Sequence, residues 1–182
     1  MLTIPPTPAQ KAYKRVLRIS RLNGWSVAIF GGLSMLVALL FGDLVGAFIG
    51  LCVTLAGWME IRGGRQLRRR DVDGMKLLVR SQLFLLAVIL SYCASRLGSF
   101  DSETVLANLT PDMEAVLTQA GLEKADVVVL VHTVFLALYI TVAVVCLIYQ
   151  GGLALYYRGK TKLVAEAITA PIAIPAQDLL PS

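Results

Sequence analysis

Four long apolar blocks divide this 182-residue chain, and they constrain its fold more than any other feature. They cover residues of about 24–41, 44–61, 77–97 and 127–150. An α-helix needs about 20 apolar residues to cross the roughly 30 Å of hydrocarbon in a bilayer. Backbone polar groups must be satisfied internally at that depth, and the blocks are too long and uniform for barrel strands. We therefore predict an all-α integral membrane protein, built as a four-helix bundle from residues 24–157.

The positions of Lys and Arg predict the orientation of the bundle. Fifteen of the 17 basic residues precede the first block, lie between the second and third or at the start of the third, or follow the fourth. The opposite side has only Arg96, at the outer end of the third block, and Lys124 in the link that follows. Because basic residues are retained on the cytoplasmic side, both termini are predicted to be cytoplasmic. The size and simplicity of the chain favour a bacterial inner membrane.

The segments outside the blocks are predicted to be short. Residues 1–23 form a basic amphipathic segment whose helix starts at Thr7-Pro8. The second link contains Gly63-Gly64, which is expected to break or bend the chain. A small extracytoplasmic helix is expected between the third and fourth spans, from Pro111 to Gly121. Residues 158–182 form a cytoplasmic tail, partly disordered, with a Pro- and Ala-rich end.

The basic inner segments are predicted to contact anionic lipid headgroups. The arginines expected to make these contacts are Arg15, Arg18, Arg68, Arg69 and Arg70. An alternative is that these charges only set the topology. Nucleic-acid binding is disfavoured, because the arginine run is short, contains no aromatic residues and is tethered between two spans.

Small residues at four-residue spacing predict close helix packing. They are Gly42, Gly46, Gly50 and Thr54. Such a row lets two helix backbones approach, and packing within the chain is favoured over a homo-oligomer interface. The third and fourth blocks each carry a small, mildly polar face. A polar path between them would be lined by Ser91, Ser95, His132, Thr133 and Thr141.

Ionisable residues are scarce within the blocks and are placed near their ends. Glu60 is expected at the inner end of the second block, and Arg96 is placed to pair with Asp43 across the outer surface. No central carboxylate is evident for proton coupling. The single His132 is interpreted as an interfacial residue rather than a ligand, and no metal or cofactor is predicted.

No hydrolase, metalloprotease or phosphate-loop motif is present, so the chain is not expected to be an enzyme. The first hypothesis is a small subunit, scaffold or assembly factor that acts through helix–helix association with a membrane partner or a second copy. The alternative is a small transporter or channel that uses the faces of the third and fourth spans.

Overall fold

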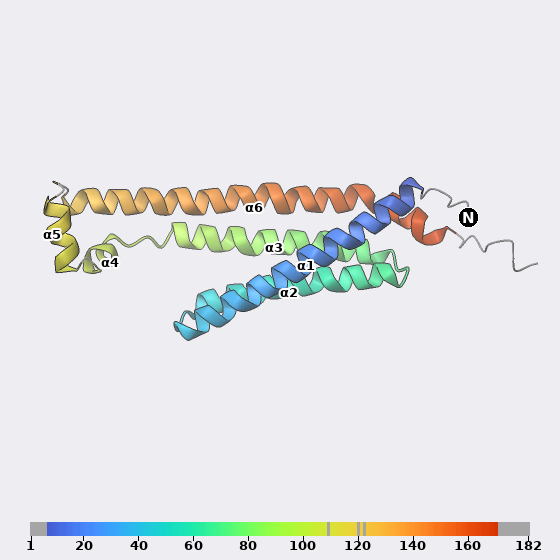
Figure 1. Ribbon diagram of the computed structural model, residues 1–182, viewed down its shortest axis with the longest axis horizontal. Helices are drawn as coiled ribbons and strands as arrows, with labels where there is room; N and C mark the ends of the chain where they lie inside the picture. Colours follow the sequence, from blue (N-terminus) through green and yellow to red (C-terminus); the bar gives the residue numbers. More distant parts are fainter. Residues whose placement is uncertain (1–6, 109, 120, 122, 171–182) are drawn as a thin grey trace, which may run out of the picture.

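The computed structural model describes residues 7–170 apart from residues 109, 120 and 122, and this part contains six α-helices and no β-strand (Figure 1). The helices are α1 (Pro8–Leu40), α2 (Leu44–Arg68), α3 (Asp73–Leu97), α4 (Ser102–Ala107), α5 (Pro111–Gln119) and α6 (Lys124–Thr169). Helices α1, α2, α3 and α6 are long and apolar enough to cross a membrane. The predicted all-α class and the four apolar helices are confirmed. The end of the predicted tail, residues 171–182, lies outside the described residues.

The long helices continue past the apolar blocks that predicted them. At the start of α1 the Thr7 side chain accepts a bond from the Gln10 backbone N–H, and the Gln10 side chain accepts one from the Thr7 N–H, at 3.2 Å each. This capping box begins one continuous helix of 33 residues, so the basic segment and the first span share one axis. Helix α6 has 46 residues and includes residues 158–169 of the predicted tail. Its length is about 69 Å.

Gly63 and Gly64 do not break the chain as expected, because they lie inside α2, which continues to Arg68. Their lack of a side chain is used for close packing. A Cβ added at Gly63 would lie 3.0 Å from the backbone oxygen of Gly74 in α3. The chain turns after α2 instead, where Arg70 has a φ of 62°, in the left-handed region.

The predicted row of small residues lies partly at the contact between α1 and α2. A Cβ added at Gly50 would come within 2.6 Å of the α1 backbone. Thr54 faces Gly31, where an added Cβ would come within 2.6 Å of the Thr54 backbone N. Gly46 belongs to the first turn of α2. Gly42, with a φ of 72°, forms the turn before it and meets no described atom within 4 Å.

Between α1 and α2, the glycines that pack against the partner helix recur every seven residues. They are Gly24 and Gly31 on α1, and Gly50 and Gly57 on α2. At Gly57 an added Cβ would lie 2.5 Å from the backbone N of Ala28. A seven-residue repeat corresponds to two turns of supercoiled helices, so it keeps one face directed at the neighbour. Helices α1 and α2 therefore form a closely packed antiparallel hairpin.

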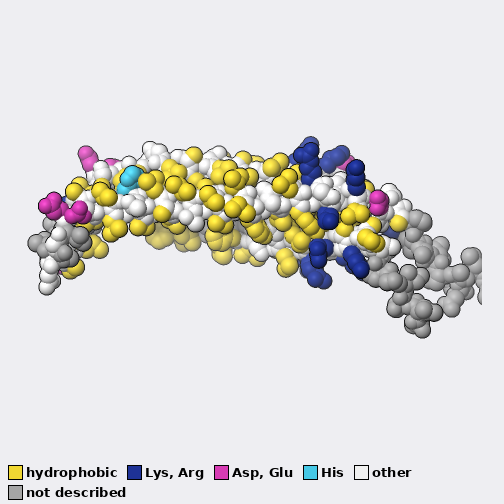
Figure 2. Space-filling model, turned by 90° about the horizontal axis from the view of Figure 1, so that it is seen from above, with side chains coloured by type: hydrophobic (Ala, Val, Ile, Leu, Met, Phe, Trp, Pro, Cys, Tyr) yellow, Lys and Arg dark blue, Asp and Glu magenta, His cyan; other side chains and the backbone are white. Residues whose placement is uncertain are grey.

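The buried core lies toward one end of the long helices. Its fully buried side chains come from all four: Val16, Leu67, Met75, Leu78, Tyr157 and Val164, each 0% exposed. Lys and Arg side chains gather over the same end, whereas acidic side chains are prominent at the other (Figure 2). We call these the basic end (residues 11–21, 62–80 and 158–162) and the acidic end (Asp43 and the described residues among 98–126).

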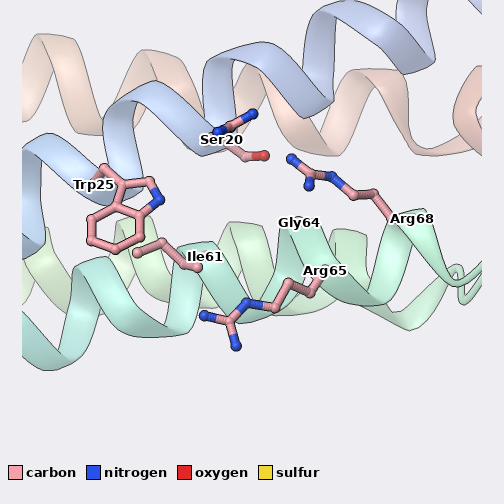
Figure 3. A pocket seen from close by; sticks show the side chains of 7 residues that line it. Ser20, Trp25, Ile61, Gly64, Arg65 and Arg68 are labelled. Carbon is pink, nitrogen blue, oxygen red and sulfur yellow. The ribbon is translucent and has the colours of Figure 1, made fainter.

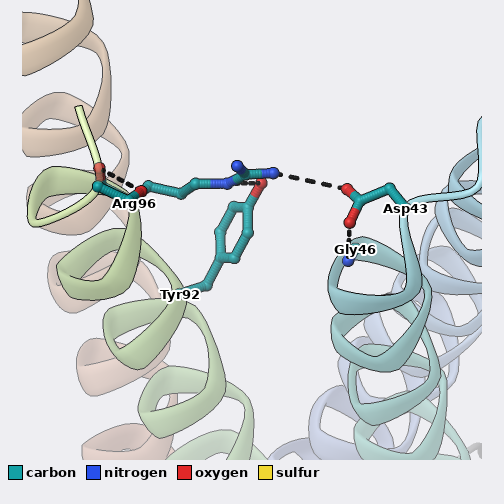
Figure 4. A network of polar contacts seen from close by, with 5 residues as sticks. Asp43, Gly46, Tyr92 and Arg96 are labelled. Atoms are coloured by element: carbon teal, nitrogen blue, oxygen red, sulfur yellow. Dashed lines mark hydrogen bonds and ion pairs between the residues drawn. The ribbon is translucent and has the colours of Figure 1, made fainter. Parts of the chain in front are cut away.

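The helices separate toward the acidic end. Figure 1 shows the α1–α2 hairpin diverging from α3 and α6 in this direction. Leu40 and Phe41 at the hairpin tip are 85% and 84% exposed. The predicted pair between Arg96 Nη2 and Asp43 Oδ2 is confirmed, at 3.5 Å, and Figure 4 shows the Arg96 side chain extended between the two helices. The Tyr92 hydroxyl accepts a bond from Arg96 Nε at 3.2 Å. Here α2 and α3 are thus linked by half-buried polar contacts.

Two short helices connect α3 to α6 at the acidic end. Helix α4 begins after Asp101, whose carboxylate accepts bonds from the Thr104 hydroxyl at 2.6 Å and the Glu103 backbone N–H at 2.9 Å. These bonds hold the pKa of the Asp101 carboxyl below its ordinary value. Helix α5 starts at Pro111 as predicted and is followed by Gly121, which has a φ of 69°.

Candidate functional site: a buried carboxyl centre

Glu60 is the most deeply buried acidic side chain in the described part of the chain, at 1% exposure. The Tyr157 hydroxyl of α6 donates to Glu60 Oε1 at 2.7 Å, and the Asn23 side-chain amide of α1 donates to Oε2 at 2.6 Å. The Tyr149 hydroxyl, two turns before Tyr157, donates to Asn23 Oδ1 at 3.2 Å. Glu60 thus joins α1, α2 and α6 directly.

Helix α3 contributes Gln82 to this group of residues. Gln82 is 1% exposed, and its side chain lies close to the Glu60 carboxyl group. The Gln82 Oε1 atom is buried and has no hydrogen-bond partner among the described residues. We call Asn23, Glu60, Gln82 and Tyr157 the carboxyl centre. Each of the four long helices contributes one member.

The carboxyl centre is held by neutral donors. Within the described residues, Glu60 forms no ion pair. Transfer of a carboxylate from water to an apolar interior is unfavourable unless hydrogen bonds replace its hydration. The two short bonds to Glu60 provide that replacement. They also fix α1, α2 and α6 relative to one another, because each donor has to stay within hydrogen-bonding distance of one carboxyl group.

Sequence reasoning missed this centre because each member, taken alone, lies near the end of an apolar block. The available signal was that Glu60 is the only acidic residue within the four blocks. It follows Leu44, the first residue of α2, by 16 positions, which corresponds to about 24 Å of helix. A carboxyl group at that depth is a functional candidate by default. Such a group can carry a negative charge or a proton.

The residues predicted to line a polar path are not enclosed within the monomer. All five are exposed: Ser91, Ser95, His132, Thr133 and Thr141. The Thr133 hydroxyl donates to the backbone oxygen of Val129 in its own helix at 2.8 Å. His132 stacks against Phe100, with ring centroids 4.4 Å apart. These residues therefore lie on outer faces of α3 and α6 and not around an internal passage.

The arginines predicted to contact lipid are all exposed at the basic end, but they occupy three different surfaces. Arg15 and Arg18 line a groove of about 520 Å³ between α1 and α6. Arg68 lines a cleft between α1 and α2. Arg69 and Arg70 lie in the turn that follows α2. Within the described residues, none of these five forms an ion pair with an acid.

No family model, curated protein or solved structure matches this chain. Across the described residues, no group of three or more His, Cys, Asp or Glu side chains is placed to hold a metal ion.

Proposed function

We propose that this protein crosses a bacterial inner membrane four times, with the basic end and both termini in the cytoplasm, and acts through lateral helix association. It serves as a small subunit, scaffold or assembly factor for a membrane partner. The distribution of Lys and Arg supports the orientation. The cytoplasmic headgroup region contacts the exposed arginines of the basic end.

The observation that carries this proposal is the difference between the two ends of the bundle. The carboxyl centre and the apolar core hold the helices together at the basic end. Toward the acidic end, the apolar stretch of α6 has no buried residue. Exposed hydroxyl groups on α3 and α6, such as those of Ser95 and Thr141, add polar character to this surface. Small and mildly polar residues favour contact with another helix, through close packing and interhelical hydrogen bonds.

Replacing Ser91 and Ser95 with phenylalanine is expected to abolish association while leaving the helical content unchanged. Both side chains are exposed, so the larger rings meet a partner rather than the core of the chain. Co-purification in a mild detergent, followed by size-exclusion chromatography with light scattering, measures the assembly. Leu83→Phe on the same helix is the control, because Leu83 is an exposed apolar residue, 53% accessible. A wild-type protein that is strictly monomeric and has no partner would contradict the proposal.

The carboxyl centre favours a second candidate, a small proton-coupled transporter. Its test is proton uptake by liposomes under an imposed pH gradient, with wild-type protein and Glu60→Gln. This variant keeps the size of the side chain and removes its titratable group. Uptake by the wild type that is lost in the variant supports transport. Equal uptake by both, or none by either, argues against it.

Reporter fusions after Asp101 and at the C-terminus are expected to report opposite sides of the membrane. Residue 101 lies in the link between the third and fourth spans, whereas the C-terminus follows the fourth. Alkaline phosphatase and a cytoplasmic fluorescent protein provide complementary readouts. Reports from the same side would contradict four crossings.

A further inference from the structure

A cleft of about 160 Å³ opens between α1 and α2 at the basic end (Figure 3). Its lining combines guanidinium groups with an indole ring and an aliphatic side chain. The lining residues are Ser20, Arg21, Trp25, Ile61, Gly64, Arg65 and Arg68. The polar groups and the apolar groups thus lie together within one small cavity.

The three arginines of the cleft have no acidic partner in the described part of the chain. In Figure 3 the Arg68 side chain extends toward the Ser20 hydroxyl, whereas Trp25 and Ile61 lie at the opposite side of the cleft. Three unpaired guanidinium groups around a small cavity favour a compact anion. Guanidinium binds phosphate oxygens through paired, charge-assisted hydrogen bonds.

The absence of a side chain at Gly64 leaves space for this cleft. A Cβ added at Gly64 would lie 2.9 Å from the Ser20 Oγ atom. Ser20 is 1% exposed, and its hydroxyl donates to the Leu17 backbone oxygen at 3.3 Å. The Ser20 hydroxyl thus lies at the buried side of the cleft, where the Arg68 side chain extends toward it. Gly64 also follows Glu60 by about one helical turn in α2.

We propose that the cleft binds the phosphate group of one anionic phospholipid, with its acyl chains along Trp25 and Ile61. This proposal rests on the membrane orientation given above. The apolar groups favour a lipid over a free phosphate ion, because a free ion has no hydrocarbon to place beside the indole. Tryptophan is also typical of the interface between hydrocarbon and headgroups. In the proposed site, Arg21, Arg65 and Arg68 bind the phosphate group. This differs from a general electrostatic attraction of anionic lipids to all basic residues.

The test uses the full-length protein in dodecyl maltoside with Trp58→Phe, which leaves Trp25 as the only tryptophan. Short-chain phosphatidylglycerol is titrated while Trp25 fluorescence is recorded. Saturable binding is expected, weakened at least about tenfold by Arg65→Gln with Arg68→Gln. The matched control is Arg69→Gln with Arg70→Gln, which removes the same charge outside the cleft and is expected to change affinity less than about twofold. Circular dichroism establishes that each variant is folded.

If both pairs of substitutions weaken phosphatidylglycerol binding equally, the proposal is overturned. Binding would then reflect general electrostatic attraction of the lipid to the basic end. Parallel titrations with phosphatidylcholine and inorganic phosphate identify the source of the anion. Inorganic phosphate that binds as tightly as phosphatidylglycerol would overturn the assignment to a lipid. Gly64→Leu fills the cleft without changing its charge and is expected to abolish binding. The readout does not require association with a partner, so it is independent of the Ser91 and Ser95 variants.

Discussion

Glu60→Ala is expected to lower the free energy of unfolding by about 4 kcal/mol. The substitution removes the acceptor of the Tyr157 hydroxyl and the Asn23 amide and leaves a cavity where all four long helices meet. A buried donor without an acceptor costs about 1–3 kcal/mol. Helical content, followed by circular dichroism as sodium dodecyl sulfate is added to protein in mild detergent, measures the effect. Unfolding at the wild-type concentration of sodium dodecyl sulfate would contradict this role of the carboxyl centre.

Two neighbouring tyrosines provide the matched control. Tyr157→Phe removes a hydroxyl that donates to Glu60 at 2.7 Å, so it is expected to be destabilising by about 2 kcal/mol. Tyr156→Phe is expected to be neutral or stabilising, because the Tyr156 hydroxyl is buried with no hydrogen-bond partner among the described residues. The combination of Glu60→Ala and Tyr157→Phe should cost less than the sum of the two, since each change removes the other's partner.

Gly57→Ala is expected to be destabilising by about 2–3 kcal/mol, although alanine is the better helix former. The added Cβ would lie 2.5 Å from the backbone N of Ala28, so α1 and α2 have to separate along their closest contact. The same detergent titration measures the loss. Gly152→Ala in α6 is the control: no described atom lies within 4 Å of its added Cβ, and the change should be stabilising by up to about 1 kcal/mol. A similar effect of both substitutions would contradict the packing role of Gly57.

The four apolar helices followed from sequence because hydrophobic length is a local property that needs no knowledge of neighbours. Their true ends did not follow. The Gly63-Gly64 pair predicts a break in the chain, but both residues lie inside α2. Gly63 packs against Gly74 of α3, and Gly64 packs against Ser20 of α1. A glycine has the same local preference in both situations. Whether the helix ends or continues at such a glycine depends on packing against the neighbouring helix.

The row of small residues predicts close helix packing, but it does not give the residues that make the closest contacts between α1 and α2. The predicted row has a spacing of four residues and begins at Gly42. The closest contacts instead have a spacing of seven residues, at Gly50 and Gly57. The carboxyl centre was missed for a related reason. Glu60 and Tyr157 are 97 residues apart, and their meeting depends on how four helices align in depth.

Because α6 is one continuous helix, a small tilt about one point moves its far end by several ångströms. Tyr157 precedes the C-terminal end of α6 by 12 residues and follows Lys124 by 33, so it divides the helix into arms of about 18 Å and 50 Å. With Tyr157 as the fulcrum, a tilt of about 5° displaces the start of α6 by about 4 Å. A partner bound at the acidic end would therefore be coupled, as by a lever, to the hydrogen bond between Tyr157 and Glu60.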